Sequence, residues 1–137
     1  MILSRIAIAW GGLGFFCFGL AYLIAPEFMV NLSGMEVPTP ASITDTRAMY
    51  GGLQIGLGSL TLFCAFNPRL VNVGVLALAL TYGGIVVCRL IGFLLDPGSL
   101  HGSDHYHLWA LGILEVPVTA TLITALVLAQ KRDGKLF

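Results

Sequence analysis

Four long apolar stretches dominate this sequence. They cover residues 6–25, 48–66, 70–95 and 108–129. Each is close to the length of about 20 residues that an α-helix needs to cross a bilayer. The first two stretches contain no charged side chain, the third contains only Arg89, and the fourth contains only Glu115. The pattern predicts four transmembrane helices joined as hairpins, which is an all-α integral membrane four-helix bundle.

The composition excludes several other classes of protein. Of the 137 residues, 57% are hydrophobic and 10% are charged, whereas a soluble domain carries about 25% charged residues. The formal net charge is zero, so no broad field attracts the chain to nucleic acid. We therefore expect a lipid bilayer as the surroundings and no nucleic-acid partner. The spans leave only short connections, so residues 1–137 are expected to form a single domain.

Proline and polar residues mark the predicted ends of the helices. Pro26 is expected to end the first helix, and Thr44 and Asp45 are candidate N-caps of the second. The remaining signals are Pro38 and Pro40, which favour an extended first loop, Asn67-Pro68 before the third helix, and Asp96-Pro97-Gly98 after it. The first span has no small-residue cleavage site behind it, so we interpret it as a retained helix rather than a signal peptide.

The charged residues predict an orientation. Hairpin connections place one set on the side of both termini: Arg5, Arg69, Lys131, Arg132 and Lys135. The opposite side receives Glu27, Glu36, Asp45, Asp96 and Asp104, with Arg47 and Arg89 at or inside helix ends. Because basic residues favour the cytoplasmic side, both termini are expected in the cytoplasm of a bacterium, with the protein in its inner membrane.

Glycine and cysteine are interpreted as packing residues. An aromatic residue followed by Gly-Gly recurs at residues 10–12, 50–52 and 82–84. Gly52 and Gly56 form a G-x-x-x-G pair, and Gly84, Cys88 and Gly92 continue the same spacing on the third span. Small residues at this spacing allow membrane helices to approach closely. Cys17, Cys64 and Cys88 form no C-x-x-C pair and are expected to serve as small buried hydrophobic residues.

Polar residues inside the spans suggest one candidate site. Arg89 and Glu115 are predicted to lie level with each other, roughly 10 Å inside the outer boundary. Helical spacing adds neighbours, and the full predicted lining is Arg47, Tyr50, Gln54, Tyr82, Arg89 and Glu115. Two interpretations remain open. Arg89 and Glu115 form a structural pair while Arg47 reaches the headgroups, or the set binds an anionic or carbonyl-bearing ligand in an outward-facing pocket.

The polar loop before the fourth span holds weaker candidates. His101, Asp104, His105 and His107 have the chemistry of zinc or copper ligands. Their spacing matches no strong metal motif, and a solvated loop with pH-sensitive histidines is the favoured interpretation. The sequence specifies no cofactor.

Several of these residues carry a family resemblance. Arg47-x-x-Tyr50-Gly51-Gly52 opens the second span, Arg89-x-x-Gly92 closes the third, and Glu115 lies in the fourth. The pattern resembles the bacterial membrane family known as domain of unknown function 4345 and, more loosely, is similar to DoxX-like four-helix membrane proteins. The resemblance implies a four-helix bundle in a bacterial inner membrane. It implies no ligand or reaction.

Three functions are compatible with these observations. The first is a non-catalytic subunit or assembly partner of a larger membrane complex or homo-oligomer, as the small size and glycine-rich faces favour. The second is a binder or carrier of a small lipophilic or anionic molecule. The third is a quinone-linked membrane oxidoreductase or an isomerase with Glu115 as its acid or base, which is motivated by DoxX-like relatives. The sequence does not decide whether the protein is an enzyme and favours a non-catalytic role.

Overall fold

The computed structural model describes residues 2–96, 98 and 115–133, and the secondary structure among them is helical. The helices are α1 (Ile2–Ile24), α2 (Pro26–Leu32), α3 (Pro40–Thr46), the π-helix η1 (Arg47–Gly52), α4 (Leu53–Phe66), α5 (Val71–Leu95) and α7 (Val116–Asp133). Three helical segments are long and apolar enough to cross a membrane: Ser4–Ile24, Pro40–Phe66 and Val71–Leu95. Residues 108–114 of the fourth predicted span lie outside the described residues.

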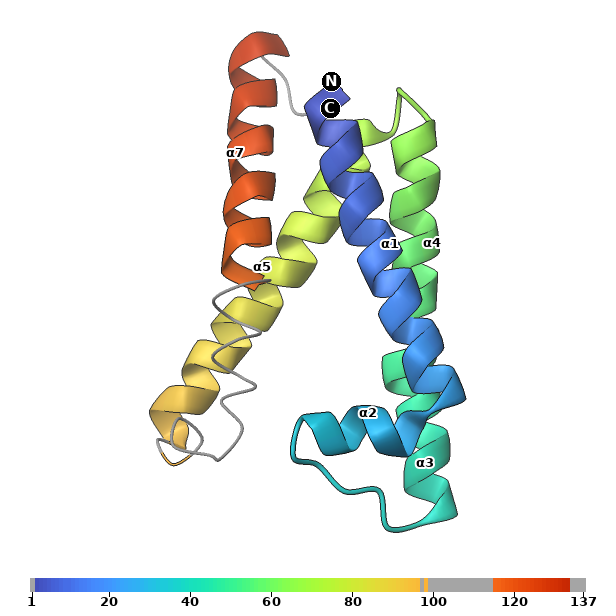
Figure 1. Cartoon of the computed structure of the whole chain (residues 1–137). Coiled ribbons are helices and arrows are strands. Elements are labelled where there is room, and N and C mark those ends of the chain that lie inside the picture. The colour runs from blue at the N-terminus through green and yellow to red at the C-terminus, as the bar shows by residue number, and fades with distance from the viewer. Residues whose placement is uncertain (1, 97, 99–114, 134–137) are drawn as a thin grey trace.

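The helices are arranged as two legs that meet at one end (Figure 1). Helices α1 and α4 run antiparallel along one leg, while α5 starts beside them and diverges along the other. Helix α7 packs against α5. The N-terminal end of α1, the α4–α5 connection and the C-terminal end of α7 all lie at the end where the legs meet, whereas α2, α3 and the C-terminal end of α5 lie at the opposite end (Figure 1). This is the arrangement that hairpin connections predict.

Helices α1, α4, α5 and α7 all contribute to one hydrophobic core. Its buried members are Ile8, Phe15, Cys64, Ala65, Val71, Val75, Leu78, Ala79 and Leu122. The α5 members belong to its N-terminal half, so the core occupies the end of the molecule where the legs meet. Of the cysteines, only Cys64 is buried; Cys17 and Cys88 lie on exposed faces of α1 and α5, contrary to the expectation that all three are buried.

The second span begins earlier than predicted. Pro40 is its first helical residue, and the candidate N-caps Thr44 and Asp45 lie inside the helix instead. Thr39 and Ser42 form a capping box, in which the Thr39 hydroxyl accepts from the Ser42 N–H at 3.1 Å and the Ser42 hydroxyl accepts from the Thr39 N–H at 3.1 Å. Pro40 has no N–H to satisfy and therefore suits the first helical position. From this cap α3, η1 and α4 run on as one segment to Phe66.

Pro26 has two roles, of which the sequence interpretation identified one. It ends α1, and it also begins the short helix α2, which was not predicted. Helix α2 closes with a Schellman motif: the Met35 N–H donates to the Val30 carbonyl and the Gly34 N–H to the Asn31 carbonyl, both at 3.0 Å. Gly34 adopts a φ of 72°, which favours glycine.

Helices α1 and α4 pack with their backbones in contact. A Cβ atom on Gly58 would lie 2.6 Å from the Phe16 nitrogen, and one on Gly19 would lie 2.7 Å from the Ile55 nitrogen. Gly12 and Gly51 occupy the facing positions. These glycines recur every seven residues on each helix, so the close approach does not use the predicted Gly52–Gly56 pair. Gly56 has open space around it within the described chain.

We predict that Gly58→Ala destabilises the fold and that Gly56→Ala does not. Overpacking the α1–α4 contact costs about 1–3 kcal/mol, which outweighs the gain of up to about 1 kcal/mol in helix propensity. The matched variant Gly56→Ala gains the propensity without the clash. Unfolding in mixed micelles titrated with a denaturing detergent measures both. Equal stability of the two variants would contradict this packing.

Candidate functional site

Arg89 and Glu115 form a two-pronged ion pair between α5 and the start of α7. The Arg89 Nε donates to Glu115 Oε2 at 2.8 Å, and Nη2 donates to Oε1 at 2.5 Å. The two side chains are only 21% and 10% exposed. Arg89 lies six residues before Leu95, the last residue of α5, which is about 9 Å along the helix at 1.5 Å per residue. The pair neutralises two charges that a bilayer interior disfavours.

The start of α7 is shaped to present Glu115. Pro117 has no N–H, which suits the first turn of a helix, where N–H groups lack intrahelical acceptors. The hydroxyl of Thr119 donates to the Glu115 carbonyl at 2.6 Å, as Thr121 and Thr124 do to the carbonyls four residues before them. Backbone and side chain of Glu115 are thus both anchored, and the residue is 7% exposed.

Tyr82 extends the same face of α5 towards α1. It lies two turns before Arg89, is partly buried, and contacts the ring of Phe15 at a centroid distance of 5.0 Å and an interplanar angle of 55°. Tyr82 therefore joins α5 to α1, two turns before the ion pair that joins α5 to the start of α7.

Arg47 and Tyr50 belong to a different part of the molecule. The Arg47 Nε donates to the Leu23 carbonyl at 3.2 Å, and the ring of Tyr50 stacks on Tyr22 at 5.2 Å. Both residues are in η1, on the leg formed with α1, while the C-terminal half of α5 lies on the other leg (Figure 1). Gln54 follows one turn later on α4 and is partly exposed. The structure does not bring the six predicted lining residues into one pocket.

Arg47 lies apart from Arg89 and Glu115 because its side chain bonds to the end of α1. The last carbonyls of a helix lack intrahelical donors, and Pro26 removes one further N–H. Arg47 supplies a donor to this end. Arg5 does the same at the other end of the helix pair, where its Nε donates to the Ala65 carbonyl near the end of α4 at 2.8 Å. The sequence interpretation assigned Arg5 only to the charge distribution, because a backbone acceptor leaves no side-chain pattern.

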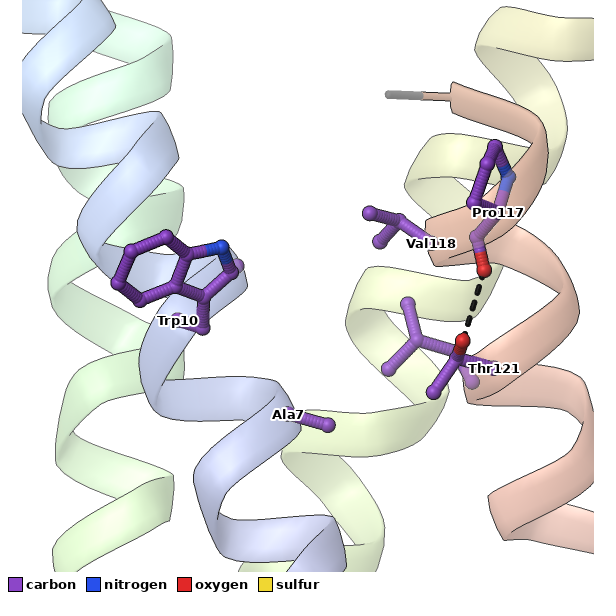
Figure 2. Close-up of a pocket in the computed structure, with 7 residues that line it drawn as sticks. Ala7, Trp10, Pro117, Val118 and Thr121 are labelled. Atoms are coloured by element: carbon purple, nitrogen blue, oxygen red, sulfur yellow. Dashed lines mark hydrogen bonds between the residues drawn. The ribbon is translucent and has the colours of Figure 1, made fainter. Parts of the chain in front are cut away.

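An apolar cavity of about 190 Å³ lies between α1 and α7 (Figure 2). Its lining comprises Ala7, Trp10 and Gly11 of α1, with Pro117, Val118, Thr121 and Leu122 of α7. The Thr121 hydroxyl donates to the Pro117 carbonyl at 2.8 Å, as the dashed line in Figure 2 marks, so the helix satisfies it. Such a lining favours apolar groups and offers little to a charged ligand. The sequence interpretation did not identify this site.

The predicted histidine-loop residues, His101, Asp104, His105 and His107, lie outside the described residues. Among the described residues, no three His, Cys, Asp or Glu side chains are grouped as a metal site would require.

Comparison with known proteins places the chain in a family. A family model described as a domain of unknown function (DUF4345) matches residues 3–126. The chain belongs to the DUF4345 family. No curated protein and no solved structure matches it. The match to DUF4345 begins within α1 and ends within α7, and it includes both members of the ion pair. A relationship to DoxX-like proteins is not shown.

We predict that Arg89 and Glu115 of this DUF4345 chain are energetically coupled. Arg89→Gln or Glu115→Gln alone removes one charge of the ion pair and leaves the other without this counter-charge, which is expected to lower the free energy of unfolding by about 2–4 kcal/mol. The double variant Arg89→Gln/Glu115→Gln is expected to regain at least half of that loss, because neither charge is then present. Detergent unfolding of all four proteins gives the coupling energy. Additive single-variant losses would show that the pair contributes nothing as a pair.

Proposed function

We propose that this chain is a multi-pass protein of the bacterial inner membrane that acts as a non-catalytic subunit or assembly partner of a membrane complex. In this proposal α1, the α3–α4 segment, α5 and a fourth helix that includes α7 cross the bilayer. Arg5 and Arg69 belong to the end where the legs meet, and Glu27, Glu36, Asp45 and Asp96 belong to the opposite end. The positive-inside rule then supports cytoplasmic termini.

The observation that carries the proposal is the contrast between two sets of glycines. Gly12, Gly19, Gly51 and Gly58 are used within the chain to pack α1 against α4. Gly52 and Gly56 lie one turn apart on an exposed face of the η1–α4 segment, and no described side chain outside their own helix approaches them. Exposed small residues at this spacing are typical of helix–helix association in membranes. We propose that this face contacts a partner helix.

The ion pair supports a structural role as well. Arg89 and Glu115 direct their charged groups at each other with two hydrogen bonds. A neutral, hydrogen-bonded pair fixes the register of α5 against α7 and is not aimed at a charged ligand. The geometry therefore favours the structural interpretation of these two residues over an anion-binding one.

We predict that Gly56→Leu releases the chain from its complex without unfolding it. The wild-type protein, extracted gently from its own membrane, is expected to migrate as an assembly larger than one chain. Gly56→Leu is expected to migrate mostly as the bare chain, because the bulky side chain blocks helix approach. Gly14→Leu is the control, since Gly14 also has open space within the described chain but lies on α1. Native mass spectrometry reads the assembly, and a wild-type protein found only as a bare chain would contradict the proposal.

A second candidate function is the binding of a small lipophilic molecule, which the α1–α7 cavity favours. Its apolar lining and the exposed Trp10 side chain suit an aliphatic or aromatic group rather than an anion. This differs from the binder that the sequence alone suggested, whose pocket was lined by arginine and glutamate.

We predict that Thr121→Phe fills the cavity and abolishes any added small mass on the purified chain. Thr124→Phe is a matched control: both threonine hydroxyls donate to the carbonyl four residues before them, at 2.8 and 2.7 Å, but Thr124 does not line the cavity. Native mass spectra of the three proteins measure the effect. A bound mass that survives in Thr121→Phe would place the ligand elsewhere.

A further inference from the structure

A second cavity lies at the end of the molecule that holds the start of α1. Its volume is about 270 Å³, and it is lined by Ile2, Arg5, Ile6 and Ala9 of α1 with Ala65 and Phe66 of α4. Ile2, Ile6 and Phe66 are 76%, 60% and 76% exposed. The site is therefore an open apolar groove with one cation in its wall, at the opposite end of α1 from Arg47.

The guanidinium of Arg5 is held in place by the protein and still has donors to offer. Its Nε donates to the Ala65 carbonyl at 2.8 Å, and both residues line the groove. A guanidinium carries five N–H donors, and this is the one hydrogen bond that the described chain provides for them. The terminal Nη groups can therefore bind an oxyanion with two parallel hydrogen bonds, as arginine does with phosphate.

Arg5 lies at the start of a candidate membrane span, which runs from Ser4 to Ile24. A long arginine side chain at the end of such a span can reach the headgroup region. Ile6 and Ala9 continue along α1 from that level into the span, on the wall of the groove. A molecule with a phosphate at one end and a hydrocarbon chain at the other would match both features at once.

The local charge also favours a negatively charged headgroup. Arg69 belongs to the α4–α5 connection at the same end of the molecule and is exposed. Four of the acidic side chains that the structure describes, Glu27, Glu36, Asp45 and Asp96, belong to α2, α3, the loop between them and the end of α5, all at the far end. Glu115 is neutralised by Arg89. Among the described side chains, the groove end is thus positively charged.

We propose that this groove binds one anionic phospholipid of the surrounding leaflet, with its phosphate on the Nη groups of Arg5 and part of an acyl chain along Ile6 and Phe66. Binding of this kind adds a lipid as a structural ligand at the α1–α4 junction. It is independent of the partner face at Gly52 and Gly56, which lies on another part of α4.

The test uses the full chain, delipidated in detergent and then titrated with dioleoyl phosphatidylglycerol or dioleoyl phosphatidylcholine, with native mass spectrometry as the readout. Wild-type protein is expected to retain one phosphatidylglycerol in preference to phosphatidylcholine. Arg5→Gln is expected to weaken that retention by about tenfold or more, because hydrogen bonds to charged groups are lost. The control is Arg47→Gln, which removes the equivalent guanidinium-to-carbonyl bond at the other end of the same helix pair; it is expected to retain the lipid.

Each alternative result would overturn a stated part of the proposal. Equal weakening in Arg5→Gln and Arg47→Gln would show that loss of the helix caps, not of a phosphate ligand, causes the change. A third variant, Ile6→Trp, fills the groove while Arg5 remains, and unchanged retention in it would exclude the groove as the acyl-chain site. Displacement of the lipid by millimolar inorganic phosphate alone would identify a free anion, rather than a phospholipid, as the ligand.

Discussion

The backbone contact between α1 and α4 is the constraint on which the other features depend. Glycines at facing positions let the two helices approach until a single added methyl group would collide with the neighbouring backbone. The pairs Arg5–Ala65, Gly12–Gly58, Gly19–Gly51 and Leu23–Arg47 progress along the two helices in opposite directions by equal steps. One antiparallel register therefore satisfies four separate contacts. The remaining helices pack around this pair. Helices α5 and α7 complete the hydrophobic core at one end, and α2 and α3 lie at the other end.

The same helix pair shows how the chain satisfies polar groups at helix ends. The last carbonyl groups of a helix lack intrahelical donors. Here Arg47 bonds to the end of α1 and Arg5 bonds to the end of α4, so each helix supplies a cationic donor to its neighbour's negatively polarised end. Arg89 is treated differently, because its partner is a carboxylate rather than a carbonyl. Arg5 and Arg47 thus bond to backbone carbonyls, whereas Arg89 forms an ion pair.

The long elements of this fold could be predicted from the sequence, but the contacts of the arginines could not. Helices α1 and α5 closely match the predicted spans 6–25 and 70–95, because the length and apolarity of each stretch determine a membrane-spanning helix. The second span was predicted to start at residue 48 because Asp45 and Arg47 interrupt the apolar run, whereas the capping box at Thr39 starts the helix at Pro40. The seven-residue spacings Gly12–Gly19 and Gly51–Gly58 are visible in the sequence, but a side-chain pattern does not show whether the helices pack on these glycines or on Gly52 and Gly56.

The candidate site was predicted in part. Arg89 and Glu115 each stand alone in an apolar span at equal predicted depth, so their pairing was one of the two interpretations that the sequence left open, and the structure pairs them. Arg47 was assigned to the same site because it lies on the same predicted side of the membrane. Position along the membrane normal does not fix the lateral position of a helix, and Arg47 faces the α1 terminus instead. Backbone acceptors, which decide this, are not visible in a pattern of side chains.

The place of the ion pair in the fold explains why a charged contact is used there. The buried α5 residues of the core end at Ala79, with Tyr82 and Ile85 packed against its edge. Arg89 lies beyond that edge, where α5 diverges from α1, and Glu115 lies at the very start of α7. Apolar packing is non-directional, so at the margin of a core it would permit α5 to slide or rotate against α7. A two-pronged hydrogen-bonded pair permits one relative position. We infer that the ion pair fixes the orientation of α5 against α7 where the hydrophobic core no longer does. A buried ion pair can serve this role even when its net contribution to stability is small.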